Sequence, residues 1–186
     1  MRTHYIRSLA SVVALSVSIV GIGGTAHAQS KLGDTAPSTV TMPLTLSCAN
    51  LSPRAQSYVR QHHLCGTTSA NSTIVPYTTV SGNCGTATLS ARKWGTGVAE
   101  FDSQVNSTQG NMIYVSYSIG WGNATTGAGS SIGVGGTTFS QNWTHMDTAG
   151  TGAGAVTGRL NGLVATLWYG GQCYGVTPGP WASVNI

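Results

Sequence analysis

The side chains best suited to acid–base chemistry are His145 and Asp147, which stand two positions apart. Residues with this spacing share one face of a β-strand. With a nearby serine, the pair would supply the base and the orienting acid of a serine hydrolase. Serine is abundant throughout the chain, so its presence alone does not favour this reaction. The competing interpretation is a polar pair at the edge of a strand or loop.

A second acidic pair, Glu100 and Asp102, has the same spacing. Its Cβ atoms would lie about 7 Å apart along one strand, within the range that separates the two carboxylates of a glycosidase. Side chains on one strand face point the same way, however, and a glycosidase needs carboxylates on either side of the sugar bond. We therefore interpret the pair as solvated carboxylates on the polar side of a strand.

Two further motifs give weaker signals. The segment 129–133 (GSSIG) matches the G-x-S-x-G elbow of hydrolases, but that elbow requires a helix directly after the serine, and none is predicted there. His62 and His63 end a predicted helix, where the helix dipole favours a cation, and no third metal ligand accompanies them. We expect neither a metal site nor a cofactor.

Three aromatic residues are candidates for ligand binding: Trp94, Tyr114 and Trp143. Each falls among threonine, serine, asparagine or arginine residues, so we expect its ring to be exposed. An exposed ring stacks on the C–H face of a sugar, while neighbouring amides and hydroxyls bond the sugar hydroxyl groups. The alternative is that these rings cover sheet edges or lie under loops. Trp121 and Trp168, by contrast, are predicted to belong to the core.

The composition restricts the functional classes. Charged residues make up only 6% of the chain, against about 25% in ordinary proteins, and the basic residues form no cluster, which argues against nucleic-acid binding. We predict a non-catalytic protein that binds a glycan or another cell-surface polymer. Two alternatives stay open: a small hydrolase using His145 and Asp147, or an inhibitor or antagonist that displays a loop such as 123–129. The oligomeric state also stays open.

The first 28 residues predict export. Arg2 and Arg7 precede an apolar run over 9–22, and residues 26–28 (AHA) have the small-x-small pattern of a signal-peptidase site. The apolar run is shorter than the ~20 residues of a membrane-spanning helix, and no second run follows it. We therefore expect a secreted protein that is not inserted in a membrane once the signal peptide, residues 1–28, has been removed.

Four cysteines lie beyond this signal, and an even number in an exported chain predicts two disulfide bonds. Of the three possible pairings we favour Cys48–Cys65, a local clamp, together with Cys84–Cys173, a long-range link. No pair has C-x-x-C spacing and no histidine stands at ligand spacing from a cysteine pair, so the cysteines do not indicate a metal site.

The element that organises the rest of the chain is the strand predicted over 111–122. Apolar and smaller or polar residues alternate along it, which predicts one apolar and one wetter face. The apolar face has to be covered by other strands. Its members are Ile113, Val115, Tyr117, Ile119 and Trp121.

Two segments precede the β region. Residues 29–47 lack periodicity and are expected to form a flexible lead-in. Within the segment 48–72, a short helix is predicted over 52–63, because Ser52 can cap it and Pro53 suits the first helical position. The Cys48–Cys65 bond would clamp this helix at both ends.

The segment 73–186 is predicted to form the β domain. Gly135-Gly136 is expected to kink or divide one strand, and Asn161-Gly162 to form a two-residue hairpin turn. Short strands separated by glycine-rich turns, without helices between them, predict an all-β fold, a single antiparallel β-sandwich with a barrel as the alternative. The predicted strands cover 73–80, 84–94, 98–105, 111–122, 131–146, 155–160, 163–169 and 181–186.

Overall fold

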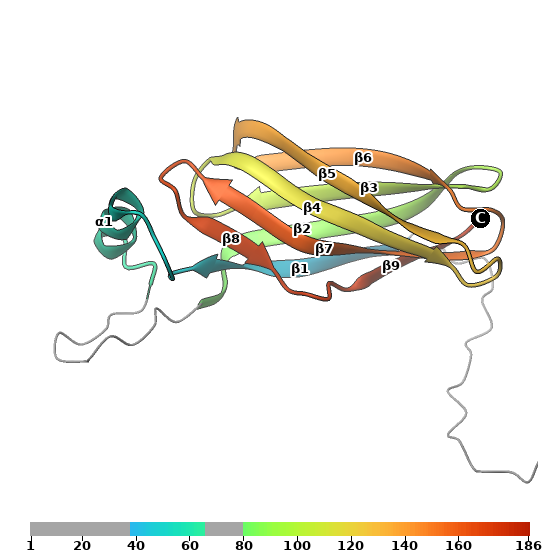
Figure 1. Cartoon of the computed structure of the whole chain (residues 1–186), viewed down its shortest axis with the longest axis horizontal. Helices are drawn as coiled ribbons and strands as arrows, with labels where there is room; N and C mark the ends of the chain where they lie inside the picture. Colours follow the sequence, from blue (N-terminus) through green and yellow to red (C-terminus); the bar gives the residue numbers. More distant parts are fainter. Residues whose placement is uncertain (1–37, 66–79) are drawn as a thin grey trace, which may run out of the picture. The chain divides into compact units, whose positions relative to one another are not determined.

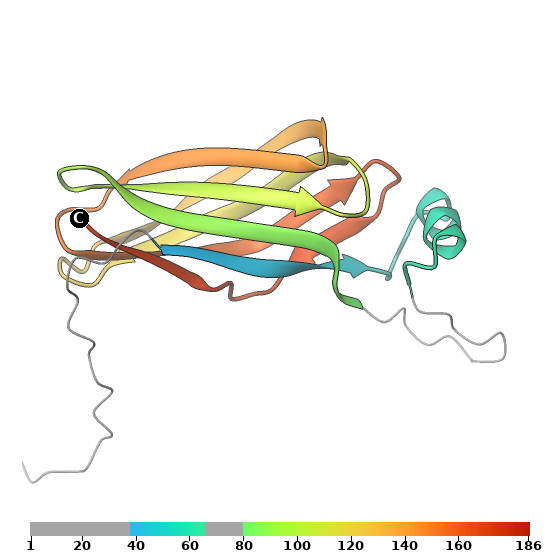
Figure 2. The same ribbon diagram turned by 180° about the vertical axis from the view of Figure 1, so that it is seen from behind.

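Nine strands and one helix form the part of the chain that the computed structural model describes, residues 38–65 and 80–186 (Figures 1 and 2). These residues all fall in one compact unit. The expected signal peptide, the lead-in over 29–37 and all but the last residue of the expected strand over 73–80 lie outside the described residues. In chain order the elements are β1 (Ser38–Ser47), α1 (Pro53–Gln61), β2 (Val80–Gly95), β3 (Val98–Ser107), β4 (Met112–Asn123), β5 (Gly129–Ser140), β6 (Asn142–Gly150), β7 (Ala155–Leu167), β8 (Gln172–Gly175) and β9 (Trp181–Asn185).

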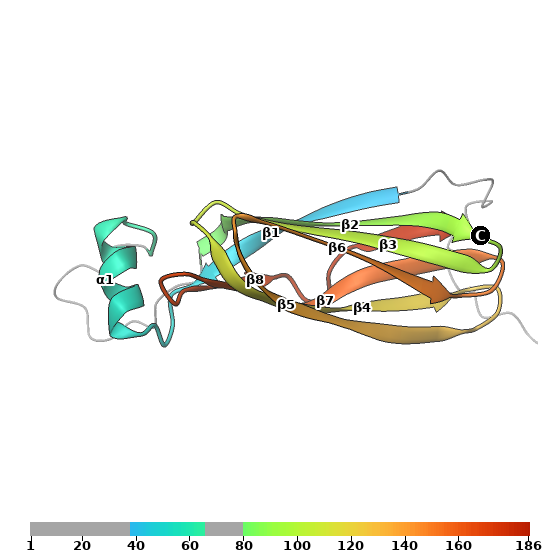
Figure 3. The same cartoon turned by 90° about the horizontal axis from the view of Figure 1, so that it is seen from above.

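The strands form one antiparallel sheet that curls back on itself. Hydrogen-bonded neighbours follow the order β5-β4-β7-β8-β1-β2-β3-β6, and β9 pairs with β7 beside this path. Seen from above, β2, β3 and β6 lie in one layer and β4, β5 and β7 in the other (Figure 3). β8 joins the layers, because it bonds to β7 on one side and to β1 on the other. The predicted all-β antiparallel fold is confirmed, as two layers of one nearly closed sheet.

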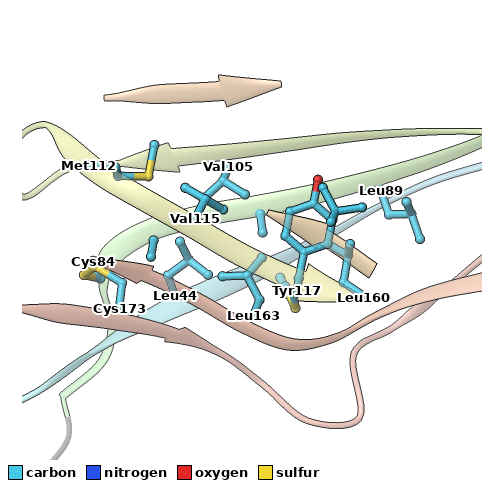
Figure 4. Close-up of a cluster of buried hydrophobic side chains, with 14 of the residues drawn as sticks. Leu44, Cys84, Leu89, Val105, Met112, Val115, Tyr117, Leu160, Leu163 and Cys173 are labelled. Carbon is cyan, nitrogen blue, oxygen red and sulfur yellow. A yellow bond between two sulfur atoms is a disulfide. The ribbon is translucent and has the colours of Figure 1, made fainter. Parts of the chain in front are cut away.

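The alternation along β4 builds the core. Val115, Tyr117 and Ile119 are buried, because every second side chain of the strand points between the layers. Removing such side chains from water stabilises the folded state by roughly 25 cal/mol per Å² of apolar surface that is buried. Figure 4 shows this core with side chains from several strands, among them Leu44, Leu89, Val105, Met112, Val115, Tyr117, Leu160 and Leu163.

The prediction is wrong for Ile113, which is exposed while Met112 is buried. The pairing register of β4 shifts between Met112 and Tyr114 against both of its neighbours. An extra residue in one strand moves the alternation by one position, so Met112 takes the inward position. Trp121, at the other end of β4, is half-buried and packs against the core.

The expectation of a flexible lead-in is wrong for residues 38–47, which form β1 between β8 and β2. Its buried side chains Met42, Leu44 and Leu46 alternate with Thr41, Pro43 and Thr45, a pattern that the threonine-rich composition obscures. Pro43 is tolerated because β8 pairs only with residues 44–47 of β1, so a missing N–H there costs no ladder bond on that side.

Two dipeptides that contain glycine, Gly135-Gly136 and Asn161-Gly162, behave differently from the prediction. β5 runs straight through Gly135-Gly136, and the chain turns instead at Gln141, between β5 and β6. Asn161-Gly162 lies inside β7 rather than in a hairpin turn. Both halves of β7 pair with β4, and the register shifts next to Gly162, whose φ of 61° is left-handed. A glycine in that conformation forms a β-bulge that a continuous strand can accommodate.

The helix forms as predicted. Ser52 caps α1, its hydroxyl accepting from the Ala55 N–H at 3.3 Å, and Pro53 occupies the first helical position. Ala55 and Val59 are its buried residues. Because an isolated helix of this length is marginal in water, its stability depends on contacts with the sheet.

Aromatic rings dock α1 against the turn after β7. Tyr58 stacks on the buried Tyr169 with 4.0 Å between ring centroids and meets Trp168 edge-on at 5.3 Å. The Arg54 guanidinium lies 5.3 Å from the centroid of the Trp168 ring. Trp168 was predicted for the core, and this prediction is wrong, because the residue is 38% exposed and packs beside the helix.

Both predicted disulfides are present. Cys48–Cys65 brackets α1, and Cys84–Cys173 links β2 to β8, the two strands that flank β1. Among residues 38–65 and 80–186, no helix has the length and apolar character needed to span a membrane.

Candidate functional site

A groove of about 520 Å³ lies on the outer face of β2, β3 and β6. The antiparallel register places its lining side chains in two ranks across the three strands. Thr88, Gln104 and Thr144 form the first rank, and Ser90, Asp102 and Met146 form the second. Adjacent strands lie about 4.8 Å apart and successive outward residues nearly 7 Å apart, so the groove presents a regular grid of hydroxyl, amide and carboxylate groups.

Both ranks of the grid continue onto the neighbouring strand β1. Thr41 and Thr39 pair with Thr88 and Ser90 respectively, and their hydroxyls hydrogen-bond across the strands at 3.2 Å and 2.8 Å. Thr39 and Thr41 are both exposed. The outer face therefore carries neutral hydroxyl groups well beyond the groove itself.

Two carboxylates and a guanidinium stand at one end of the groove. Arg92 on β2 donates to the fully buried Glu100, and its Nη2 also lies 3.3 Å from Asp102 Oδ2. The expectation of two solvated carboxylates is therefore wrong for Glu100, whereas the Asp102 side chain is 38% exposed. The arrangement neutralises Glu100, and it leaves Asp102 as the one acidic group that faces the groove among its lining residues.

The pair His145 and Asp147 lies on the other face of β6. His145 Nε2 is 2.9 Å from Asp147 Oδ2, close enough for an ion pair when the imidazole is protonated, although the two atoms are not aligned as a hydrogen bond. Both side chains are partly exposed. Because β6 ends the hydrogen-bonded path, its inward side chains are only partly covered by the opposite layer.

Ser103 is the serine nearest to this pair in the pairing register, directly opposite His145. Its hydroxyl donates to the backbone carbonyl of His145 at 3.0 Å and also bonds the Tyr117 hydroxyl. A serine hydroxyl has one proton, so Tyr117 is the donor in the second bond. Among the described residues, no serine hydroxyl bonds the imidazole, and the serine–histidine bond that activates the nucleophile of a triad is lacking.

Tyr117 and Trp143 complete this inner polar cluster. Burial raises the pKa of Tyr117, its contacts with Ser103 and Trp143 lower it in part, and the charge of Asp147 raises it. The Trp143 indole nitrogen is buried and makes no well-aligned hydrogen bond within the described part of the chain. The cluster is thus a structural support between the layers, with no free nucleophile.

The three predicted aromatic binding residues do not lie together. Trp94 is 61% exposed near the end of β2, about 13 Å along the strand from Ser90. Tyr114 is exposed on β4, in the other layer (Figure 3). Trp143 is half-buried, packs against the core and stacks near His145 with 6.3 Å between ring centroids. Trp94 and Trp143 both lie on strands that line the groove, but Trp143 is on the inward face of β6, together with His145.

The other motifs identified in the sequence bring no further functional side chains together in the described part of the chain. Residues 129–133 open β5 rather than an elbow before a helix. His62 is the C-cap of α1 and His63 follows it. Within residues 38–65 and 80–186, no cluster of three or more histidine, cysteine or acidic side chains is suited to a metal ion.

The exposed loop over 124–128 is anchored by one buried residue, Asn123. Its Nδ2 donates to the Thr151 carbonyl at 2.8 Å, and its Oδ1 accepts from the N–H groups of Thr125 and Thr126 at 2.8 Å and 3.1 Å. These bonds hold the loop against the turn after β6. The loop carries no charged side chain.

Apart from Asp102, the groove residues were missed at the level of the sequence, although a signal for them exists. The polar halves of two neighbouring alternating segments, 86–92 and 100–106, contain most of them. Which polar positions face each other depends on strand register and on β6 joining β3, and neither follows from local pattern.

Comparisons of the chain with models of known protein families, with curated proteins and with solved structures found no match. Its function therefore has to be inferred from the geometry of its own residues.

Proposed function

We propose that this chain is an exported, non-catalytic protein that binds a neutral, hydroxyl-rich polymer, most simply a polysaccharide. The observation that carries the proposal is the two-rank grid of side chains in the groove on β2, β3 and β6. This proposal relocates the predicted glycan-binding surface from the three scattered aromatic rings to the polar face of one layer.

The chemistry of the grid matches that of a sugar chain. Hydroxyl groups both donate and accept hydrogen bonds, as do the threonine and serine hydroxyls and the Gln104 amide. The exposed carboxylate of Asp102 can accept from two adjacent sugar hydroxyls, because it has two oxygens. Met146, which is 50% exposed, supplies an apolar, adaptable side chain for the C–H face of the ring.

Charge favours a neutral polymer over an acidic one. Arg92 at the end of the groove is already engaged by two carboxylates, and Asp102 would repel an anionic chain. Export is supported by the signal-like segment at residues 1–28 and by the two disulfides, which persist in oxidising compartments.

Co-sedimentation with a panel of insoluble neutral polysaccharides tests the proposal. The double variant Thr88→Ala/Gln104→Ala removes two neighbouring members of the first rank, and we expect at least a tenfold loss of affinity, corresponding to about 1.4 kcal/mol. Thr166→Ala on β7 is the matched polar control, and Tyr114→Ala is the aromatic control in the other layer. Equal binding by wild type and the double variant, or no binding to any member of the panel, would contradict the proposal.

A further inference from the structure

The strand β5 has an open hydrogen-bonding edge. It stands at one end of the ladder and pairs, among the described residues, only with β4. A single residue, Gln141, separates β5 from β6, yet the two strands do not pair. One side of the β5 backbone, over as many as 12 residues, therefore presents N–H and C=O groups without a strand partner within the described part of the chain.

From Gly129 to Thr137 this edge lacks the features that usually prevent strand addition. Proteins protect exposed edges with lysine, proline, bulges or very short strands. The β5 sequence, GSSIGVGGTTFS, contains neither a charged residue nor a proline. Its register against β4 is regular from Gly129 to Thr137, and one extra residue of β5 follows between Thr137 and Ser140. At its far end Phe139 is 73% exposed, the highest value among the exposed large hydrophobic residues of the described chain.

We propose that the β5 edge pairs with β5 of a second copy of this chain, antiparallel and across a two-fold axis. A two-fold axis makes two identical edges antiparallel and self-complementary. Cross-strand partners must point to the same face, so their residue numbers add to an even total. The midpoint of β5 lies between Val134 and Gly135. A two-fold axis placed at Gly135 therefore pairs nearly the whole of β5 with β5 of the second copy.

The side chains favour this register, because each larger one meets a smaller one. Phe139 lies opposite the partner's Ser131, Val134 opposite the partner's Gly136, and Thr137 opposite the partner's Gly133. Ile132, which is half-buried, lies opposite the partner's Thr138. No like charges meet, since β5 carries none. The strand is therefore its own complement, whereas a foreign strand would need to supply the same pattern independently.

The groove lies on the outer face of β2, β3 and β6, whereas β5 belongs to the other layer (Figure 3). The pairing does not rest on the proposed glycan binding, and the two are tested separately.

A charge-exchange pair of variants tests both the contact and its register. Gly133→Lys/Thr137→Lys places lysine opposite lysine twice, and Gly133→Lys/Thr137→Glu places lysine opposite glutamate twice. Both positions are exposed, and a Cβ at Gly133 meets nothing within 4 Å. Within one chain these positions are about 13 Å apart, so the variants differ chiefly across the two-fold contact.

Sedimentation equilibrium over a concentration series is the measurement, on the full chain with both disulfides formed. We expect wild type to dimerise, the Lys/Glu variant to remain dimeric, and the Lys/Lys variant to dissociate with a dimer Kd at least about tenfold above that of the Lys/Glu variant. Amides of β5 should exchange more slowly with deuterium at higher protein concentration. Gly95→Lys, at another position with nothing within 4 Å of its Cβ, controls for added charge.

A far-UV circular dichroism spectrum like that of wild type, together with cooperative unfolding, would establish that the variants are folded. The denaturant midpoint itself is expected to fall when the dimer is lost. A wild type that stays monomeric throughout the series overturns the proposal. A dimer in which the Lys/Lys and Lys/Glu variants dissociate equally also overturns it, because positions 133 and 137 would then not face each other across the contact.

Discussion

The hydroxyl of Ser103 donates to the backbone carbonyl of His145 at 3.0 Å, across the β3–β6 pair. The same hydroxyl accepts from Tyr117, which reaches it from the opposite layer. This bond joins the two layers where the sheet is open, between β5 and β6. It also commits the only proton of Ser103, which is why this serine is not hydrogen-bonded to the nearby imidazole as the nucleophile of a triad would be.

Removing Ser103 should destabilise the fold more than removing an exposed serine. In Ser103→Ala the buried Tyr117 hydroxyl loses its partner, and we expect the free energy of unfolding to fall by about 1–3 kcal/mol. Ser118→Ala, at an outward position of β4, is the control. Denaturant titration of Ser103→Ala, Tyr117→Phe and the double variant should give a double-mutant loss smaller than the sum of the single losses; additive losses would show that the bond contributes nothing.

Arg92 should be far more important to stability than its exposure suggests. Glu100 is fully buried, and Arg92 is its salt-bridge partner in the described chain, so Arg92→Met leaves an uncompensated buried carboxylate at a cost of about 3–5 kcal/mol. Adding Glu100→Leu should restore most of that loss. Asp102→Asn, which removes the more exposed carboxylate, should change the unfolding free energy by about 0–1 kcal/mol. Equal denaturation midpoints for Arg92→Met and Asp102→Asn would contradict this assignment.

Stability should fall in alkaline solution. Burial raises the pKa of both Tyr117 and Tyr169, and the neighbouring Tyr58 adds to the rise at Tyr169. Above the ordinary tyrosine pKa of about 10, the unfolded chain releases these protons while the folded chain retains them. The folded state then binds more protons, so the unfolding free energy is unaffected below about pH 10 and decreases above it, by up to about 1.4 kcal/mol per pH unit for each group.

Urea titrations between about pH 8 and about pH 11 measure this slope. Tyr169→Phe should flatten it, since the variant has no phenol to ionise, and Tyr174→Phe, at an exposed site, is the control. A slope that Tyr169→Phe leaves unchanged would mean that this phenol does not contribute.

The two disulfides should contribute unequally. They span sequence separations of 17 and 89 residues, for which loop entropy gives about 3 and about 4.6 kcal/mol. Replacing Cys84 and Cys173 by alanine should therefore lower the unfolding free energy by more than replacing Cys48 and Cys65. The second pair of substitutions should mainly loosen α1, detected as faster amide exchange over Pro53–Gln61. A larger loss from the Cys48–Cys65 variant would contradict the ranking.

Local features of the sequence determined much of the fold. Apolar alternation in 84–94, 98–105 and 111–122 identifies strands because a pleated strand has a two-residue period. Ser52 and Pro53 mark the start of α1 because capping depends on neighbouring residues alone. The disulfide pairing also followed, since a short clamp and a long link suited the order of the predicted elements.

Tertiary structure decided the rest, because strand pairing joins residues that are distant in the chain. Residues 38–47 become a strand only between β8 and β2, and Asn161-Gly162 becomes a bulge only because β4 pairs with both halves of β7. The candidate groove depends on register as well: Thr88, Gln104 and Thr144 are ordinary polar residues in the sequence, and they form one rank only when β2, β3 and β6 are aligned. Likewise, whether a ring such as Trp143 is exposed depends on what the opposite layer places against it.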